Sequence, residues 1–209
     1  MATLRILAAA ALLFAGCVPE SINPLSTPAT SAIDQRFEGV YQEIRKDSDS
    51  TAGRGYWHFH YRGASDTAKG ERRSTTWLEI LGVGHEPKSG LEITRYKALA
   101  TKIAGRDYLS FIELPQDGAK KSPGTYSFAR YEVNWRGDLR VWIAKESAFV
   151  SAVKAGKLRG KVTGGSFGES VTLTDTTANL AAFIAASDSH KLFDGEPMIF
   201  RRLSGAKDR

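Results

Sequence analysis

The sequence contains one cysteine, Cys17, among 209 residues, so no internal disulfide can form and a folded core must hold by packing alone. Its N-terminal apolar run, Ile6 to Phe14, is shorter than the roughly 20 apolar residues that a membrane-spanning helix needs. The 29 basic and 23 acidic residues give a net charge of +6, but the basic residues stand as scattered pairs. A nucleic-acid partner would require a dense basic patch, so we expect none.

The first 17 residues have the organisation of a signal peptide. One basic residue, Arg5, precedes the apolar run, and two small residues, Ala15 and Gly16, separate this run from Cys17. A lone cysteine is often a small buried hydrophobe, but no folded interior exists directly after a signal core to bury it. Ala15-Gly16-Cys17 resembles the lipobox of bacterial lipoproteins, with Phe14 where leucine is more usual.

This resemblance implies cleavage before Cys17, a diacylglycerol on its sulfur and an acyl chain on the new amine. Two or three acyl chains hold a protein firmly on a membrane, at about 0.8 kcal/mol per buried CH₂. In bacteria with two membranes, Val18 after the cysteine implies transport to the outer membrane, because Asp at this place is the usual retention signal. We expect a lipid-anchored envelope protein that faces the periplasm, with the membrane as its partner, no cofactor and no catalytic activity.

The remainder of the chain divides into a linker, one domain and a tail. Residues 17–34 comprise Cys17 and a segment with three prolines, several Ser and Thr and no hydrophobic period, which predicts a flexible linker. Residues 35–205 form the predicted single domain, and residues 206–209 a polar tail. Removal of the signal peptide, residues 1–16, leaves 193 residues with a charge of +5, enough for one domain with its own core.

Alternation of apolar and polar side chains predicts many antiparallel strands. It is clearest in residues 55–61, where Trp57, Phe59 and Tyr61 point one way and His58 and His60 the other. Strands are predicted over residues 37–44, 55–61, 74–83, 91–103, 108–114, 126–135, 139–143, around 162, 171–173 and 197–203. Helices are predicted from about residue 146 to 156 and after a cap at residues 174–175. We therefore expect a mainly β domain, an antiparallel barrel or strongly curved sheet with two short C-terminal helices.

Both ends of the predicted domain resemble a known group of barrels. Gly39-Val40-Tyr41 in the first strand is similar to the Gly-x-Trp of lipocalins and related calycins, with Tyr41 in place of Trp. In those barrels a basic residue near the end of the chain lies across this ring, a role that the resemblance assigns to Arg201 or Arg202. Residues 173–203 also resemble the C-terminal end of lipocalin-like bacterial lipoproteins of unassigned function. The helix near residue 146 departs from their up-and-down strand order.

Aromatic side chains are the candidates for a ligand site. Trp57, Phe59 and Tyr61 would line the interior of the barrel, together with some of the remaining aromatics: Tyr41, Trp77, Phe111, Tyr131 and Trp135. A barrel of about eight strands either holds one small apolar molecule or fills itself with side chains. The first outcome predicts binding of an apolar or lipid-like molecule, and the second a protein-interaction or structural module of unknown partner.

Two patterns suggest chemistry that their context does not favour. His58-x-His60 has a spacing that suits zinc or copper, with Glu43, Glu79 or His85 as a third ligand, but an ordinary polar outer face explains it as well.

Gly164-Gly165-Ser166-Phe167-Gly168 matches the nucleophile elbow of hydrolases, and His190 and two candidate acids, Asp175 and Asp188, follow it. The elbow requires a helix after the turn, whereas residues 169–173 alternate as a strand, so a Gly-rich turn is favoured. Arg136-Gly137-Asp138, an adhesion tripeptide in some proteins, lies between two predicted strands and is interpreted as a tight turn.

Overall fold

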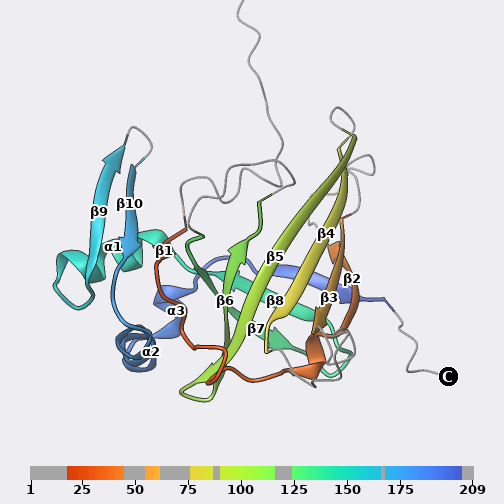
Figure 1. Cartoon of the computed structure of the whole chain (residues 1–209), viewed down its shortest axis with the longest axis horizontal. Coiled ribbons are helices and arrows are strands. Elements are labelled where there is room, and N and C mark those ends of the chain that lie inside the picture. The colour runs from red at the N-terminus through yellow and green to blue at the C-terminus, as the bar shows by residue number, and fades with distance from the viewer. Residues whose placement is uncertain are drawn as a thin grey trace, which may run out of the picture.

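A closed barrel of eight antiparallel strands forms the body of the protein (Figure 1). The computed structural model describes residues 18–44, 55–61, 76–86, 90–115, 124–165 and 168–203. The barrel strands are β2 (Gly39–Ile44), β3 (Tyr56–Tyr61), β4 (Leu78–Glu86), β5 (Gly90–Ile103), β6 (Arg106–Glu113), β7 (Ser127–Val133), β8 (Leu139–Ile143) and β11 (Met198–Arg202). Each strand from β2 to β8 pairs with the next, and β11 closes the barrel between β8 and β2. The predicted mainly β, lipocalin-like barrel is confirmed.

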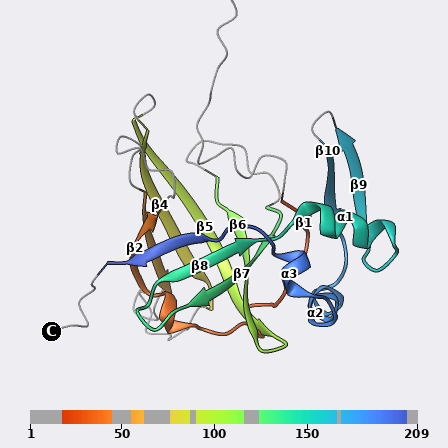
Figure 2. The same ribbon diagram turned by 180° about the vertical axis from the view of Figure 1, so that it is seen from behind.

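The last barrel strand is separated from the others by a long excursion of the chain. It comprises α1 (Glu146–Lys154), β9 (Gly160–Gly165), β10 (Gly168–Leu173), α2 (Thr177–Ala186) and α3 (Ser189–Leu192). β10 pairs with β9 and, in parallel, with the short N-terminal strand β1 (Glu20–Ser21). Figures 1 and 2 show this excursion standing beside the barrel. The helix near residue 146 therefore leaves the strand order of the barrel intact, because the chain returns to close it as β11.

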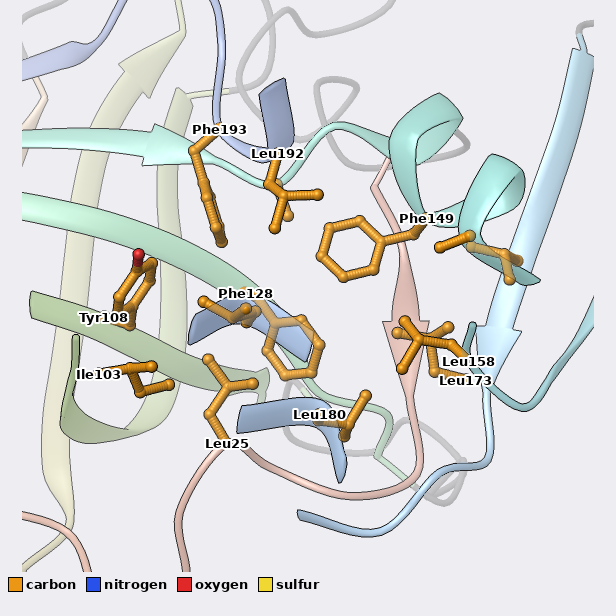
Figure 3. Close-up of a cluster of buried hydrophobic side chains, with 14 of the residues drawn as sticks. Leu25, Ile103, Tyr108, Phe128, Phe149, Leu158, Leu173, Leu180, Leu192 and Phe193 are labelled. Carbon is orange, nitrogen blue, oxygen red and sulfur yellow. The ribbon is translucent and has the colours of Figure 1, made fainter. Parts of the chain in front are cut away.

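The buried side chains form two clusters on opposite faces of one barrel wall. The barrel core lies on the inner face and consists of Phe37, Tyr41, Phe59, Tyr61, Leu78, Ile80, Ala98, Ala100, Leu109, Ala129, Tyr131, Leu139, Val141 and Phe200. The flank core lies between the outer face and the excursion, with Phe149, Leu158, Leu173, Leu180 and Phe193 among its members (Figure 3). In β6, Tyr108 belongs to the flank core and Leu109 to the barrel core, as expected for a strand buried on both faces.

Residues 18–34 do not form the expected flexible linker. Leu25 is 2% exposed within the flank core, and its N–H donates to the Ser110 hydroxyl at 2.8 Å. Ser21 exchanges two backbone hydrogen bonds with Tyr126, at 2.8 and 2.7 Å, and Ala32 pairs with Ala100. We call residues 18–34 the strap. Its prolines do not prevent docking, because an extended chain can still bury single apolar side chains and bond through its other amides. Regular structure in the strap is limited to the two residues of β1.

Trp135 also lies outside its predicted position. β7 ends at Val133, so the alternation that would place Trp135 inside the barrel stops two residues earlier. Its side chain stands in the β7–β8 turn and is 86% exposed. Among the residues that the structure describes, no helix has the length and apolar character to cross a bilayer.

Candidate functional site

One end of the barrel is closed by the short helix η1 (Gln35–Phe37), and we call it the η1 end. Phe37 is fully buried in the barrel core, with its ring centroid 4.5 Å from that of Tyr131 and 5.8 Å from that of Phe59. The hydroxyl of Tyr41 donates to the Arg36 carbonyl at 2.9 Å. Aromatic rings and one hydrogen bond therefore fix η1 in place.

Asp34 attaches η1 to the barrel wall. Its carboxylate accepts two hydrogen bonds from the Arg36 guanidinium, at 2.8 and 2.6 Å, and one from the Tyr131 hydroxyl at 2.8 Å. Its backbone N–H donates to the Tyr61 hydroxyl at 3.0 Å. Burial raises the pKa of Asp34, but the hydrogen bonds from Arg36 and Tyr131 outweigh it, so the pKa lies below its ordinary value. Burial raises the pKa of Tyr61 to about 12.

Of the two C-terminal arginines, Arg202 lies across the ring of Tyr41, with its guanidinium carbon 5.9 Å from the ring centroid. The guanidinium also donates to the Glu38 carbonyl, at the C-terminal end of η1. A Cβ at Gly39 would lie 3.4 Å from the Arg202 Nε, and the φ of +150° at this position favours glycine. This is the arrangement that the calycin resemblance implies, whereas the Arg201 side chain is exposed.

At the opposite end of the barrel, which we call the Trp57 end, the inner aromatic rings are only partly buried. The ring centroid of Tyr96 lies 6.3 Å from that of Trp57 and 5.8 Å from that of Phe111. Trp57 lies against Gly82 on the neighbouring strand, where a Cβ would come within 2.7 Å of the indole. A large ring therefore fits here only because residue 82 has no side chain.

Carboxylates stand near these rings. The Trp57 Nε1 lies 3.4 Å from a Glu43 carboxylate oxygen. Partial burial and the nearby Glu92 raise the pKa of Glu113, and burial followed by these two carboxylates raises the pKa of Tyr96. The Trp57 end therefore combines apolar rings with nearby carboxylates.

The three residues predicted to line a cavity share one inner face of β3, but they differ in environment. Phe59 and Tyr61 are 4% and 5% exposed and are packed into the barrel core. Phe59 contacts Tyr41 and Phe200 in edge-on geometry, with centroid distances of 5.1 and 6.1 Å. Trp57 lies at the partly buried end, so it is the most accessible member of the trio.

The two histidines lie on the outer face of the barrel. His58 and His60 are exposed and their rings stack with centroids 5.8 Å apart. Glu79 is the cross-strand neighbour of His60, whereas Glu43 approaches Trp57 on the inner face. No group of three potential metal ligands occurs in the described part of the chain, and the side chain of His85 lies outside it.

The residues of the hydrolase motif have other roles where they are described. Gly164 and Gly165 end β9 and Gly168 begins β10, so a strand follows the motif as expected for a hairpin. Ser166 itself lies outside the described residues. Asp175 accepts hydrogen bonds from the Arg159 N–H at 2.7 Å and from Asn179 at 2.8 Å, which lower its pKa. Asp188 caps α3 by accepting from the His190 N–H.

Arg136-Gly137-Asp138 forms a tight turn between β7 and β8. The Asn134 side-chain oxygen accepts from the backbone N–H groups of Arg136 and Asp138, both at 2.9 Å. The Asp138 carboxylate in turn accepts from the Arg202 N–H at 3.1 Å. The tripeptide is therefore explained by the turn that it builds.

Sequence reasoning missed Asp34 and the tyrosine pair that binds it. The polar composition of the strap concealed Asp34, although an Asp directly before a short segment with a buried Phe is an N-cap signal that could have identified it. Tyr131 follows the alternation of β7, but its partner is 97 residues away in the sequence and is visible only in three dimensions.

No protein-family profile, curated protein or solved structure matches this chain. The lipocalin-like character therefore depends on the closed eight-stranded barrel and on the local geometry of Gly39, Tyr41 and Arg202.

Proposed function

We propose that this protein is a lipid-anchored lipoprotein of the bacterial envelope, whose barrel binds an apolar or lipid-like small molecule at the Trp57 end. The anchor is Cys17, acylated after removal of residues 1–16, and the location is the periplasmic side of the outer membrane. The support for the anchor is the signal-like N-terminus and lipobox, since Cys17 lies outside the described residues.

The observation that supports binding is the difference between the two barrel ends. The η1 end is closed by Phe37 and the Asp34 hydrogen bonds, whereas Trp57, Tyr96 and Phe111 are partly buried. Partly exposed aromatic rings over an apolar interior provide contact area for an apolar guest with little loss of side-chain entropy.

Native mass spectrometry of gently purified protein tests this proposal, together with titration by a fluorescent fatty acid. We expect carried lipid and a saturable fluorescence change that Trp57→Ala weakens and Trp135→Ala leaves unchanged. Equal affinities in the two variants, or no saturable change in the parent protein, would reject binding at the Trp57 end.

The anchor has a separate test. Cys17→Ser is expected to remain unprocessed and to lose the mass of the acyl groups, because the thiol that carries them is absent. If the variant is processed and fractionates with membranes like the parent protein, the anchoring proposal is wrong.

A second candidate is a protein-interaction module without a small ligand. It is favoured by Trp135, which is 86% exposed beside Arg136, whose guanidinium lies 4.6 Å from the ring centroid. Trp and Arg are enriched in the few residues that dominate protein interfaces. A photo-crosslinking amino acid at position 135 in living cells would capture one defined protein under this alternative.

A further inference from the structure

The strap runs along the outer wall from one end of the barrel to the other. Near its start, Ser21 pairs with Tyr126, which directly precedes β7, and Ser127 of β7 is the neighbour of Phe111 at the Trp57 end. Near its finish, Asp34 bonds to Tyr61 and Tyr131 at the η1 end. The first described residue, Val18, therefore lies toward the Trp57 end.

The direction of β1 agrees with this placement. β1 is parallel to β10, so its N-terminal side points the same way as Gly168, the first residue of β10. Figures 1 and 2 both show the paired strands β9 and β10 extending to the same side as the paired strands β4 and β5, which extend the Trp57 end. Val18 is 9% exposed, and Cys17 is attached to it by one peptide bond, with about 3.8 Å between their Cα atoms.

We infer that the strap fixes the orientation of the barrel on the membrane, so that the Trp57 end faces the lipid surface that carries the anchor. This inference rests on the proposed acylation of Cys17. Because no flexible spacer separates Cys17 from the folded body, the acyl chains and the Trp57 end must lie on the same side.

The outer surface at this end suits contact with a lipid bilayer. Tyr56, Val83 and Ile93 are cross-strand neighbours on the outer face of β3, β4 and β5. Tyr56 is 42% exposed and Ile93 39%, and Leu91, two residues nearer to the β4–β5 turn, is 67% exposed. We call these four residues the rim.

The next row of outward-facing residues, farther from the β4–β5 turn, consists of Val40, His58, Leu81 and Arg95. His58 and Arg95 are exposed polar side chains, and Val40 is 43% exposed. An apolar edge above a row that contains exposed polar side chains fits a surface that enters the interfacial region of a bilayer but does not cross it. An apolar ligand of the barrel would then pass between the bilayer and the Trp57 end without crossing water.

The test places a tryptophan at either end of the barrel and measures quenching by brominated phospholipids. Leu91→Trp adds the reporter to the rim, and Ile33→Trp, at a position 41% exposed near the η1 end, is the matched control. The lipidated full chain is purified and reconstituted in vesicles of phosphatidylethanolamine and phosphatidylglycerol, and circular dichroism verifies the fold of each variant. The emission of the parent protein, measured in the same brominated vesicles, is subtracted from the emission of each variant.

We expect the emission added by Leu91→Trp to be strongly quenched and that added by Ile33→Trp to be unaffected. Equal quenching of the two, quenching of Ile33→Trp alone, or quenching of neither would overturn the inference. Mass spectrometry of the peptide that contains Cys17 reports acylation separately. If no acyl group is found, the proposed anchor fails, and a maleimide phospholipid coupled to this thiol, the single one in the sequence, still permits the orientation to be measured.

Discussion

An acid beside the barrel core and an acid beside the flank core are stabilised in opposite forms. Asp34, beside the barrel core, receives hydrogen bonds from Arg36 and Tyr131, so its pKa lies below the ordinary value. Glu146, at the start of α1, is 6% exposed, and burial followed by the nearby Glu20 raises its pKa despite a hydrogen bond from the Val171 N–H. Its Oε2 has no hydrogen-bond partner within the described part of the chain.

This difference shows how two cores on one wall are specialised. At the η1 end of the barrel core, the charged Asp34 carboxylate is held by several hydrogen bonds, which favours one rigid arrangement. The flank core accepts an incompletely bonded carboxyl, at a cost, in order to connect α1 to β10. The two cores share β5 to β7, so each depends on the other for a well-packed wall.

The largest expected effect tests whether the two cores are separable. Phe37→Ala in the barrel core and Phe149→Ala in the flank core should each cost about 3–5 kcal/mol, because both rings are fully buried. Since the cores share one wall, urea unfolding followed by near- and far-ultraviolet circular dichroism should remain a single transition in both variants. Two separate transitions in Phe149→Ala would show that the flank unfolds independently.

Asp34→Asn should destabilise the barrel closure by about 2 kcal/mol, because hydrogen bonds to a charged acceptor are lost. The pKa of Asp34 is depressed in the folded state, so its contribution is present above the ordinary value of 3.8 and disappears as the pH falls through the lowered pKa. The difference between parent and variant should therefore shrink in acid. Urea titrations at several pH values measure it, and a constant difference would contradict the assignment.

Gly82→Ala should cost about 1 kcal/mol, at the low end for overpacking, because Trp57 lies at a partly buried end and can move. The added Cβ would come within 2.7 Å of the indole, so a shift in tryptophan emission should accompany the loss of stability. Gly84→Ala is the matched control, since a Cβ there meets nothing within 4 Å. Identical behaviour of the two variants would mean that Trp57 does not rest on Gly82.

Glu146→Gln should slightly stabilise the flank at about pH 7, because it removes a buried charge that the folded state disfavours. The pKa of Glu146 is raised, so its cost appears as the pH rises from the ordinary 4.5 through the raised value and is absent in acid. The gain is small because the new amide nitrogen also lacks a partner. Thermal unfolding across this pH range should show that the stability of Glu146→Gln relative to the parent protein increases with pH. Stabilisation in acid alone would contradict the prediction.

The smallest effect is expected at Trp135, which belongs to neither core. Trp135→Ala should change the free energy of unfolding by less than about 0.5 kcal/mol, since the side chain is 86% exposed. Trp57→Ala should cost more, because that ring packs against Tyr96 and Phe200. Chemical denaturation compares the two, and a large cost at Trp135 would reveal packing that its exposure does not indicate.

The strands could be predicted closely because period-2 alternation depends only on which face each side chain occupies. β3, β5 and β8 lie within one residue of their predicted bounds. The strap was mispredicted since its contacts are few and distant, such as Leu25 with Ser110. For the candidate site, alternation correctly placed Trp57, Phe59 and Tyr61 on one inner face. It could not show which of the three lies at the partly buried end.

Sequence alone determined the strand-rich class and the lack of internal disulfides, because composition and short-range periodicity carry this information. The lipid anchor proposed at Cys17 also depends on the sequence alone. Only the tertiary structure decided that residues 18–34 are part of the domain, that Arg202 rather than Arg201 covers Tyr41, and that Asp34 closes one end. These outcomes depend on contacts between residues far apart in the chain, where burial and hydrogen bonding select one arrangement among many that the local pattern permits.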